Sequence, residues 1–307
     1  MAYVPIAQIS TAGNAVMCAF FGIQCLIHVF LGIDYRRWRF LIFMFSGTAL
    51  SCVGYAGRAW YSRDAATSPY IMQAVCVAIG PGLVTGAVKD LFVHFVSYMR
   101  MKKIDQEPNW YMDSGIEKFG YYEKLNRFIT LASSVLIGVG IGVLSGSDLN
   151  DSKMKQSIQV ALAGFALQLA VLGITLILWS FFIYHTMGQP YMHGRVKTYV
   201  FSLFVVLLLL IIRFSYRVAE WAKILKLGLA NNLTINEDYL VCLDGLTTLL
   251  AGMILIVEHP GFVFGKAELK QIDDEFHEYE KQNKAAASPT VQNLQILRYV
   301  PLFHLFF

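Results

Sequence analysis

Three charged residues at the end of a long apolar segment carry the strongest signal for chemistry inside a membrane. Arg213, Arg217 and Glu220 are spaced i, i+4 and i+7, which places them on one helix face. The apolar run before them, Tyr199 to Ile212, is too short to cross a hydrocarbon core of about 30 Å. The helix must therefore continue through the charges. They predict a stripe lining a cavity toward the outer leaflet, or arginines that extend to lipid phosphates while Glu220 pairs locally.

A second group of polar residues is expected beside this stripe. Asp244 lies about one and a half turns inside the next apolar segment, with Glu237 just before it. A buried carboxylate needs a cationic partner, and Arg217 or Arg213 is the natural one because one loop joins the two segments. Arg58 either joins this cluster or anchors its helix at the interface. The candidate substrate-binding residues are Arg58, Gln73, Arg213, Arg217, Glu220, Glu237 and Asp244.

Histidines lie toward the opposite ends of three segments. His28, His94 and His259 could hold a metal, as in an intramembrane hydrolase, if their helices bring them together. This is an alternative interpretation, and the favoured one assigns no metal. Near them, Lys89 and Asp90 are expected to form an ion pair, with the lysine extending to the interface. A nucleotide-binding motif is absent from the sequence, so we expect no cofactor.

Composition limits the class of protein that can use these residues. The chain has 307 residues, of which 56% are hydrophobic and 15% are charged. Soluble domains carry roughly 25% charged residues, so this chain cannot coat a soluble surface. Its five cysteines show no spacing typical of a disulfide framework or a zinc site. A soluble globular enzyme is therefore excluded.

The apolar residues fall into seven blocks of helical length. Backbone amides inside lipid have no water to bond, so each block must be a helix. The sequence therefore predicts an all-α polytopic membrane protein, a seven-transmembrane-helix bundle. The predicted segments are Ile9 to Ile33, Phe40 to Trp60, Tyr70 to Met99, Phe128 to Leu144, Ile158 to Tyr184, Tyr199 to Glu220 and Tyr239 to Glu258.

The bundle is expected to occupy residues 1–261 as one domain, with a tail over 262–307. The tail stretch from Lys266 to Ala287 is charged and favours a helix. The apolar end from Leu297 to Phe307 is too short to cross a bilayer. Within the bundle, Pro81 predicts a kink in the third helix because proline has no amide hydrogen.

Orientation follows from the distribution of the 25 Lys and Arg residues. Most of them lie in the tail and in the loops after the first, third and fifth segments. Because basic loops face the cytoplasm, this predicts an N-terminus outside and a cytoplasmic C-terminus. The two Asn-x-Ser/Thr sequons, at Asn150 and Asn232, both fall in loops placed outside and are candidate glycosylation sites.

The charged residues also form a pattern with specific neighbours. Its most distinctive part is Arg213, Arg217, Glu220, Glu237, Tyr239, Asp244 and the sequence His259-Pro260-Gly261. Earlier matching residues are Tyr3, Pro5, Asn14, His28, Gly54, Tyr55, Arg58, Gln73, Pro81, Gly164 and Gln168. This pattern resembles the fungal RTA-like, or lipid-translocating exporter, family. The chain departs from the family pattern at Ser51 and Lys89, and so resembles a divergent member.

The resemblance implies a seven-helix fungal protein that exports sphingoid long-chain bases or sterol analogues and contributes to stress or drug resistance. We therefore expect a transporter and not an enzyme, in the plasma membrane or alternatively an endomembrane. Glu220, Glu237 and Asp244 would receive an ammonium head, with Arg213 and Arg217 holding the acids in place.

Membrane lipids and an amphipathic cationic or sterol-like molecule are the expected partners, and no nucleic acid. One alternative is a seven-transmembrane receptor-like sensor, whose basic third loop from Arg100 to Arg127 would meet a cytoplasmic partner. The second alternative is the metal-dependent lipid hydrolase.

Overall fold

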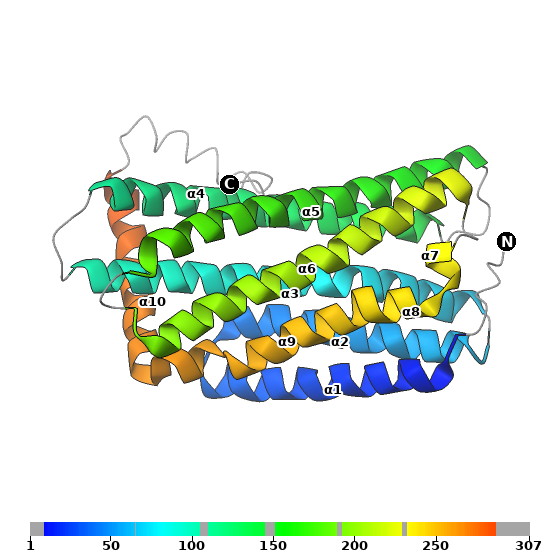
Figure 1. The fold of residues 1–307 in the computed structure, drawn as a ribbon, viewed down its shortest axis with the longest axis horizontal. Coiled ribbons are helices and arrows are strands. Elements are labelled where there is room, and N and C mark those ends of the chain that lie inside the picture. The colour runs from blue at the N-terminus through cyan, green and yellow to red at the C-terminus, as the bar shows by residue number, and fades with distance from the viewer. Residues whose placement is uncertain are drawn as a thin grey trace.

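The computed structural model describes residues 9–64, 66–104, 110–144, 151–188, 192–228 and 232–286, and shows no strand among them (Figure 1). These residues form an α-helical bundle, which confirms the predicted fold class. The elements are α1 (Thr11–Asp34), α2 (Trp38–Tyr61), α3 (Thr67–Ile104), α4 (Trp110–Leu144), α5 (Asp151–Thr186), α6 (Gly194–Leu227), α7 (Asn232–Ile235), α8 (Glu237–Leu240), the π-helical turn η1 (Val241–Leu246), α9 (Thr247–Val257) and α10 (Pro260–Ala286).

The helices form a closed ring in chain order. Each of α1 to α6 packs against the next, and α6 packs against α9, which returns to α1. The elements α8, η1 and α9 follow one another as a single column along the bundle (Figure 1). Because α3 also contacts α6 across the ring, residues from α2, α3, α6 and η1 can meet in the interior.

Most of the predicted spans agree with the structure. Six helical stretches in the described part of the chain are long and apolar enough to cross a membrane, and a shorter apolar stretch, Phe128–Leu144, forms the end of α4. The region from Arg100 to Arg127, predicted as the third loop, is helical in its described parts. Helix α3 continues to Ile104 and α4 already begins at Trp110, because a helix can extend beyond the hydrocarbon where water solvates its polar side chains.

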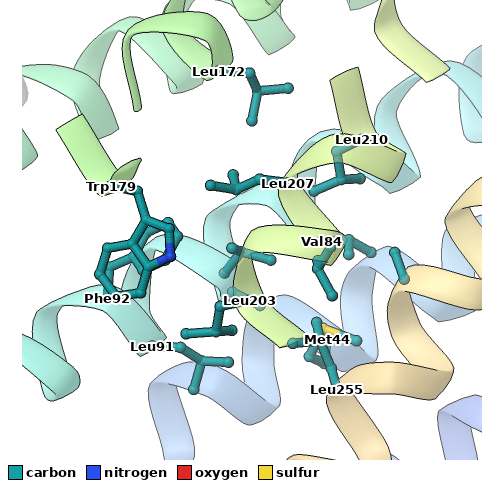
Figure 2. Packing of buried hydrophobic residues seen from close by; sticks show 14 of the residues in the cluster. Met44, Val84, Leu91, Phe92, Leu172, Trp179, Leu203, Leu207, Leu210 and Leu255 are labelled. Atoms are coloured by element: carbon teal, nitrogen blue, oxygen red, sulfur yellow. The ribbon is translucent and has the colours of Figure 1, made fainter. Parts of the chain in front are cut away.

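The core contains large side chains that interlock between helices (Figure 2). Leu203, Leu207 and Leu210 recur at helical spacing on α6 and are fully buried. Trp179 of α5 packs on Phe92 of α3, with ring centroids 4.1 Å apart. The outer face is also apolar, with exposed residues that include Leu26, Phe30, Ile177 and Val257. An apolar face of this extent is typical of a surface covered by lipid.

Helix α6 continues without a break through Arg213, Arg217 and Glu220, as its short apolar run predicted. Helix α3 likewise continues through Pro81. One close approach brings α2 onto α3 near this proline, because a Cβ atom on Gly47 would lie 2.9 Å from the carbonyl oxygen of Gly80. Glycine therefore permits the two backbones to touch there.

Helix α10 runs across one end of the bundle (Figure 1) and contacts α3 and α6. It contains the helical part of the predicted tail but begins at Pro260, just before the expected domain boundary. Gly265 interrupts it with a φ of 72°, a conformation that glycine adopts easily. The apolar end from Leu297 to Phe307 lies outside the described residues.

Candidate functional site

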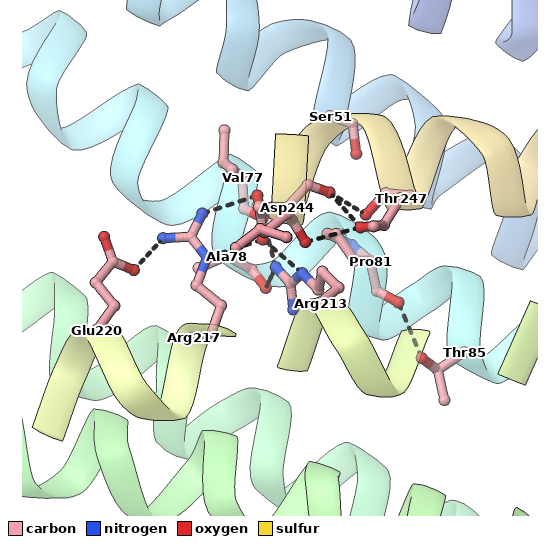
Figure 3. A network of polar contacts seen from close by, with 12 residues as sticks. Ser51, Val77, Ala78, Pro81, Thr85, Arg213, Arg217, Glu220, Asp244 and Thr247 are labelled. Atoms are coloured by element: carbon pink, nitrogen blue, oxygen red, sulfur yellow. Dashed lines mark hydrogen bonds and ion pairs between the residues drawn. The ribbon is translucent and has the colours of Figure 1, made fainter. Parts of the chain in front are cut away.

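The buried carboxylate of Asp244 is shared by two arginines of α6 (Figure 3). Its Oδ1 atom lies 2.7 Å from Arg213 Nε and 2.8 Å from Arg217 Nε, and its Oδ2 atom accepts a 2.9 Å hydrogen bond from Arg217 Nη2. Arg213 is 0% exposed and Asp244 is 1% exposed. The structure thus brings together both arginines that the sequence offered as partners for this acid.

The π-helical turn η1 positions Asp244. A π turn inserts an extra residue into a helix and changes the direction of the side chains that follow. The carbonyl oxygen of Asp244 accepts hydrogen bonds from the hydroxyls of Thr247 and Thr248, at 3.2 and 2.7 Å. Gly245 lies directly under the hydroxyl of Tyr55, where a Cβ atom would collide with it. This turn was not predicted, since apolar periodicity does not distinguish it from an ordinary helix.

Pro81 supplies a backbone acceptor for Arg213. A proline has no amide hydrogen, so the carbonyl of Val77, four residues earlier, has no helical donor. Arg213 Nη2 donates to this oxygen at 3.0 Å and to the oxygen of Ala78 at 3.3 Å (Figure 3). The break in hydrogen bonding in α3 is therefore filled by a charged side chain of α6.

Glu220 forms the outer part of this buried group. Its Oε2 atom accepts a 2.9 Å hydrogen bond from Arg217 Nη1, one helical turn away. Within the described residues this is its one ion pair. Glu220 is 4% exposed. Among the described residues it contacts one donor residue, whereas Glu237 and Asp244 each contact more than one.

Glu237 receives three donors, two from the start of α1 and one from α2. It lies 3.1 Å from Arg58 Nε, accepts a 2.7 Å hydrogen bond from Asn14 Nδ2, and accepts another, 2.6 Å long, from the amide of Ser10. Arg58 Nη1 also reaches Gln73 Oε1 at 3.5 Å. All seven candidate substrate-binding residues therefore lie at the Ser10 end of the bundle. Ser10 and Asn14 were missing from that set, although Asn14 belonged to the family pattern.

Formal charges balance across these residues. Three arginines, at positions 58, 213 and 217, face three carboxylates, at positions 220, 237 and 244. We call these six residues the charged cluster. Buried ions are tolerated in a membrane interior when each has a partner of opposite charge. Each charge in the cluster therefore has a partner without a ligand, and an added cation would compete with an arginine for a carboxylate.

The three histidines do not form a metal site. His28 and His259 both contact the ring of Phe40, whereas His94 lies 3.2 Å from Asp90. Among the described residues no group of three or more His, Cys, Asp or Glu side chains could hold a metal ion. The geometry that the metal-dependent hydrolase required is thus not formed.

Lys89 differs from the expectation of a side chain extending to the interface. It is 2% exposed, and its Nζ atom donates to Asn126 Oδ1 at 3.0 Å and to the hydroxyl of Thr130. Asn126 in turn donates to the hydroxyl of Thr175 at 2.9 Å. Polar groups on α4 thus solvate the ammonium inside the protein, and α5 orients one of them through Thr175.

The His259-Pro260-Gly261 sequence forms the turn between α9 and α10. His259 Nδ1 accepts a 3.1 Å hydrogen bond from the amide of Gly261. Pro260 occupies the first position of α10, where its missing amide hydrogen costs nothing. Gly261 lies against the ring of Tyr35, so a larger residue would collide with it.

Comparisons with known proteins identify relatives of the chain. Residues 44–267 match the family described as RTA1 like protein. Similar curated proteins include the sphingoid long-chain base transporter RSB1 from Saccharomyces cerevisiae strains Lalvin EC1118, YJM789 and S288c. Each is 24% identical over 298 residues, which cover 82% of this chain and 72% of the relative. No solved structure matches the chain.

Proposed function

The chain belongs to the RTA1-like protein family, and from this premise we propose that it transports amphipathic cationic lipids of the sphingoid long-chain base type across its membrane. The observation that carries the proposal is the charged cluster inside an apolar bundle. Ionisable residues within membrane-spanning helices usually mark a path for a substrate or an ion. The similar yeast proteins are named sphingoid long-chain base transporters, which supports the same substrate class.

Glu220 is the carboxylate we propose as the first contact for an ammonium head. It has one ion pair among the described residues, while both oxygens of Asp244 are already held by arginines. An ammonium bound at Glu220 would replace one donor from Arg217 by another charge-assisted donor. Asp244 then acts mainly by holding Arg213 and Arg217, and Glu237 by tying α1 and α2 to α8.

The proposed orientation places the Ser10 end, and with it the charged cluster, at the outer leaflet. It rests on the distribution of Lys and Arg and on the two sequons. Asn150 lies outside the described residues, and Asn232 is the first residue of α7. The proposal also includes export toward the outer leaflet and a plasma-membrane location. It further includes sterol-like substrates and resistance to stress or drugs.

The test uses purified protein in phosphatidylcholine vesicles and a fluorescent sphingoid long-chain base, with its uncharged N-acyl derivative as the comparison lipid. We expect the wild type to accelerate movement of the base and not of the derivative. Glu220→Gln should slow that movement about tenfold, which corresponds to about 1.4 kcal/mol. Lys223→Gln, at an exposed site on the same helix, is the matched control.

Equal movement of both lipids would contradict recognition of the charged head. Saturable binding of the base without any movement would instead favour the receptor-like alternative.

A further inference from the structure

Two buried histidines at the far end of the bundle have ring nitrogens without hydrogen-bond partners. His28 and His259 are each 0% exposed, and both rings contact Phe40, with centroids 5.9 and 5.3 Å away. Both nitrogens of His28 and Nε2 of His259 lack a hydrogen bond of ordinary geometry, although the backbone of Gly252 faces His28. Buried polar atoms left in this state are rare and need an explanation.

The remaining nitrogen of His259 identifies the tautomer. Nδ1 accepts a hydrogen bond from the amide of Gly261, so the proton of the neutral ring must be on Nε2. A second proton can bind only at Nδ1, where it would face the amide hydrogen of Gly261. Protonation of His259 therefore breaks the hydrogen bond that forms the turn into α10.

Ion pairs attach helix α10 to the turn between α1 and α2 and to α3 at this end of the bundle. Lys266 Nζ lies 2.7 Å from Asp34 Oδ1, and Arg37 Nη1 lies 2.7 Å from Asp273 Oδ1. A third pair joins α10 to α3, between Lys102 and Glu268, at 2.8 Å. Since α10 runs across this end (Figure 1), a change at its first turn acts on the element that covers the bundle.

Burial, assisted by nearby charges, keeps His259 neutral in this conformation. Burial lowers the pKa of His259 to about 3, and the nearby His28 and Arg37 act in the same direction, while Asp34 opposes them. Arg37 also contacts His94 and Asp273, and Asp34 contacts Lys266. A conformation that admits water to this end would remove the burial and allow protonation near neutral pH.

We propose that the protein exchanges one proton for one cationic lipid, with His28 and His259 as the proton-binding pair and α10 as the element that the proton releases. This inference rests on the proposed function. The exchange is electrically balanced, since one positive charge moves each way and no covalent bond other than N–H forms or breaks.

The charged cluster and the histidine pair are connected through the structure. Helix α1 and the α8–α9 column contact or carry residues of both. Asn14 of α1 contacts Glu237 of α8 at one end, and Gln24 Nε2 donates to the carbonyl oxygen of Leu249 at 3.1 Å in between. A movement of α9 caused at His259 therefore reaches η1 and Asp244 along one column.

The experiment uses a labelled N,N,N-trimethyl sphingoid base in phosphatidylcholine vesicles that contain the full chain. This probe has a fixed charge and cannot carry a proton itself. A pH difference of one unit across the vesicle membrane should concentrate the probe about tenfold in the wild type if exchange is one for one. His28→Gln and His259→Asn should bring the probe only to equal concentrations on both sides.

Asparagine at position 259 can still accept from Gly261, so that variant preserves the turn without a titratable ring. His193→Gln, at the exposed N-cap of α6, is the control and should concentrate the probe like the wild type. Melting temperatures of both variants near that of the wild type would show that they are folded. If His28→Gln unfolds, His259→Asn alone decides the question.

A wild type that moves the probe down its own gradient but does not concentrate it would overturn proton exchange and leave the proposed function intact. A wild type that moves neither this probe nor the unmethylated base would overturn both. Variants that still concentrate the probe about tenfold would remove the histidines from the mechanism.

Discussion

Arg213 donates a 3.0 Å hydrogen bond to the carbonyl oxygen of Val77, the acceptor that Pro81 leaves without a helical amide. The proline and the arginine lie on different helices, and neither has a favourable place in an apolar bundle alone. Together they satisfy each other, since a buried guanidinium needs acceptors and a broken helix ladder needs a donor. This relationship explains why α3 continues through a proline beside the charged cluster.

Pro81→Ala should lower stability, although alanine is the better helix former. The new amide would compete with Arg213 for Val77, and a hydrogen bond to a charged group contributes about 1.5 to 3 kcal/mol. We expect a lower melting temperature in detergent. Pro69→Ala, in the first turn of the same helix where no amide partner is needed, is the control. A Pro81→Ala variant more stable than the wild type would show that the arginine does not depend on the freed carbonyl.

The sequence was sufficient for the parts of the site that depend on helix length and spacing. The short apolar run before Arg213 required a helix through Glu220, and the burial of Asp244 required a cation. It was not sufficient where the backbone departs from a regular helix. The π turn that holds Asp244 leaves no mark in apolar periodicity, and the carbonyl of Val77 has no side-chain signal except Pro81, four residues later.

The sequence also did not predict the tertiary contacts of some charged side chains. The sequence favoured a Lys89 that extends to the interface, because its partners Asn126 and Thr130 on α4 are distant in the chain and carry no charge. The position of α10 across the bundle depends on ion pairs between residues more than 160 positions apart, such as Lys102 and Glu268. Such pairings are set by packing and not by local pattern.

Acid should destabilise the folded protein through His259. Its pKa is about 3 in the folded state and 6.5 in the reference state, so the unfolded chain binds the proton more tightly. The contribution of neutral His259 to the free energy of unfolding is therefore fully present above pH 6.5. It is lost as the pH falls toward the pKa of His259 in the folded state. Between pH 6.5 and 4.5 the loss should reach about 2 kcal/mol.

Melting temperatures of the wild type and of His259→Asn across that range measure this contribution. The variant should lose less stability on acidification than the wild type, and His193→Asn should behave like the wild type. Parallel curves for the wild type and His259→Asn would contradict a buried neutral imidazole at this position.

The proposed orientation predicts glycans on the outer loops. Glycosidase treatment should change the gel mobility of the protein made in a fungal host, and the change should disappear when Asn150 and Asn232 are both replaced by Gln. An epitope placed after residue 286 should be reached by antibody only in permeabilised cells. Labelling of that epitope in intact cells would show that the orientation is the reverse of the proposed one, with the charged cluster at the cytoplasmic leaflet.

The sharing of Asp244 by two arginines makes a specific prediction about double variants. Asp244→Asn leaves Arg213 without its acid and should cost roughly 3 to 5 kcal/mol, as for other broken buried pairs. Adding Arg213→Gln should recover much of this loss, because Arg217 and Glu220 still pair at 2.9 Å. Adding Arg217→Gln instead should recover less, since Arg213 and Glu220 then each lose a charged partner.

Melting temperatures of these variants and movement of the sphingoid base in vesicles should be measured together. If Asp244 only holds the arginines, transport should return with stability in the Arg213→Gln, Asp244→Asn variant, because Glu220 and Arg217 remain. Restored stability without transport would assign Asp244 to the substrate itself. Equal recovery in both double variants would mean that Asp244 does not distinguish the two arginines, which contradicts the observed contacts of Arg217 with both Asp244 and Glu220.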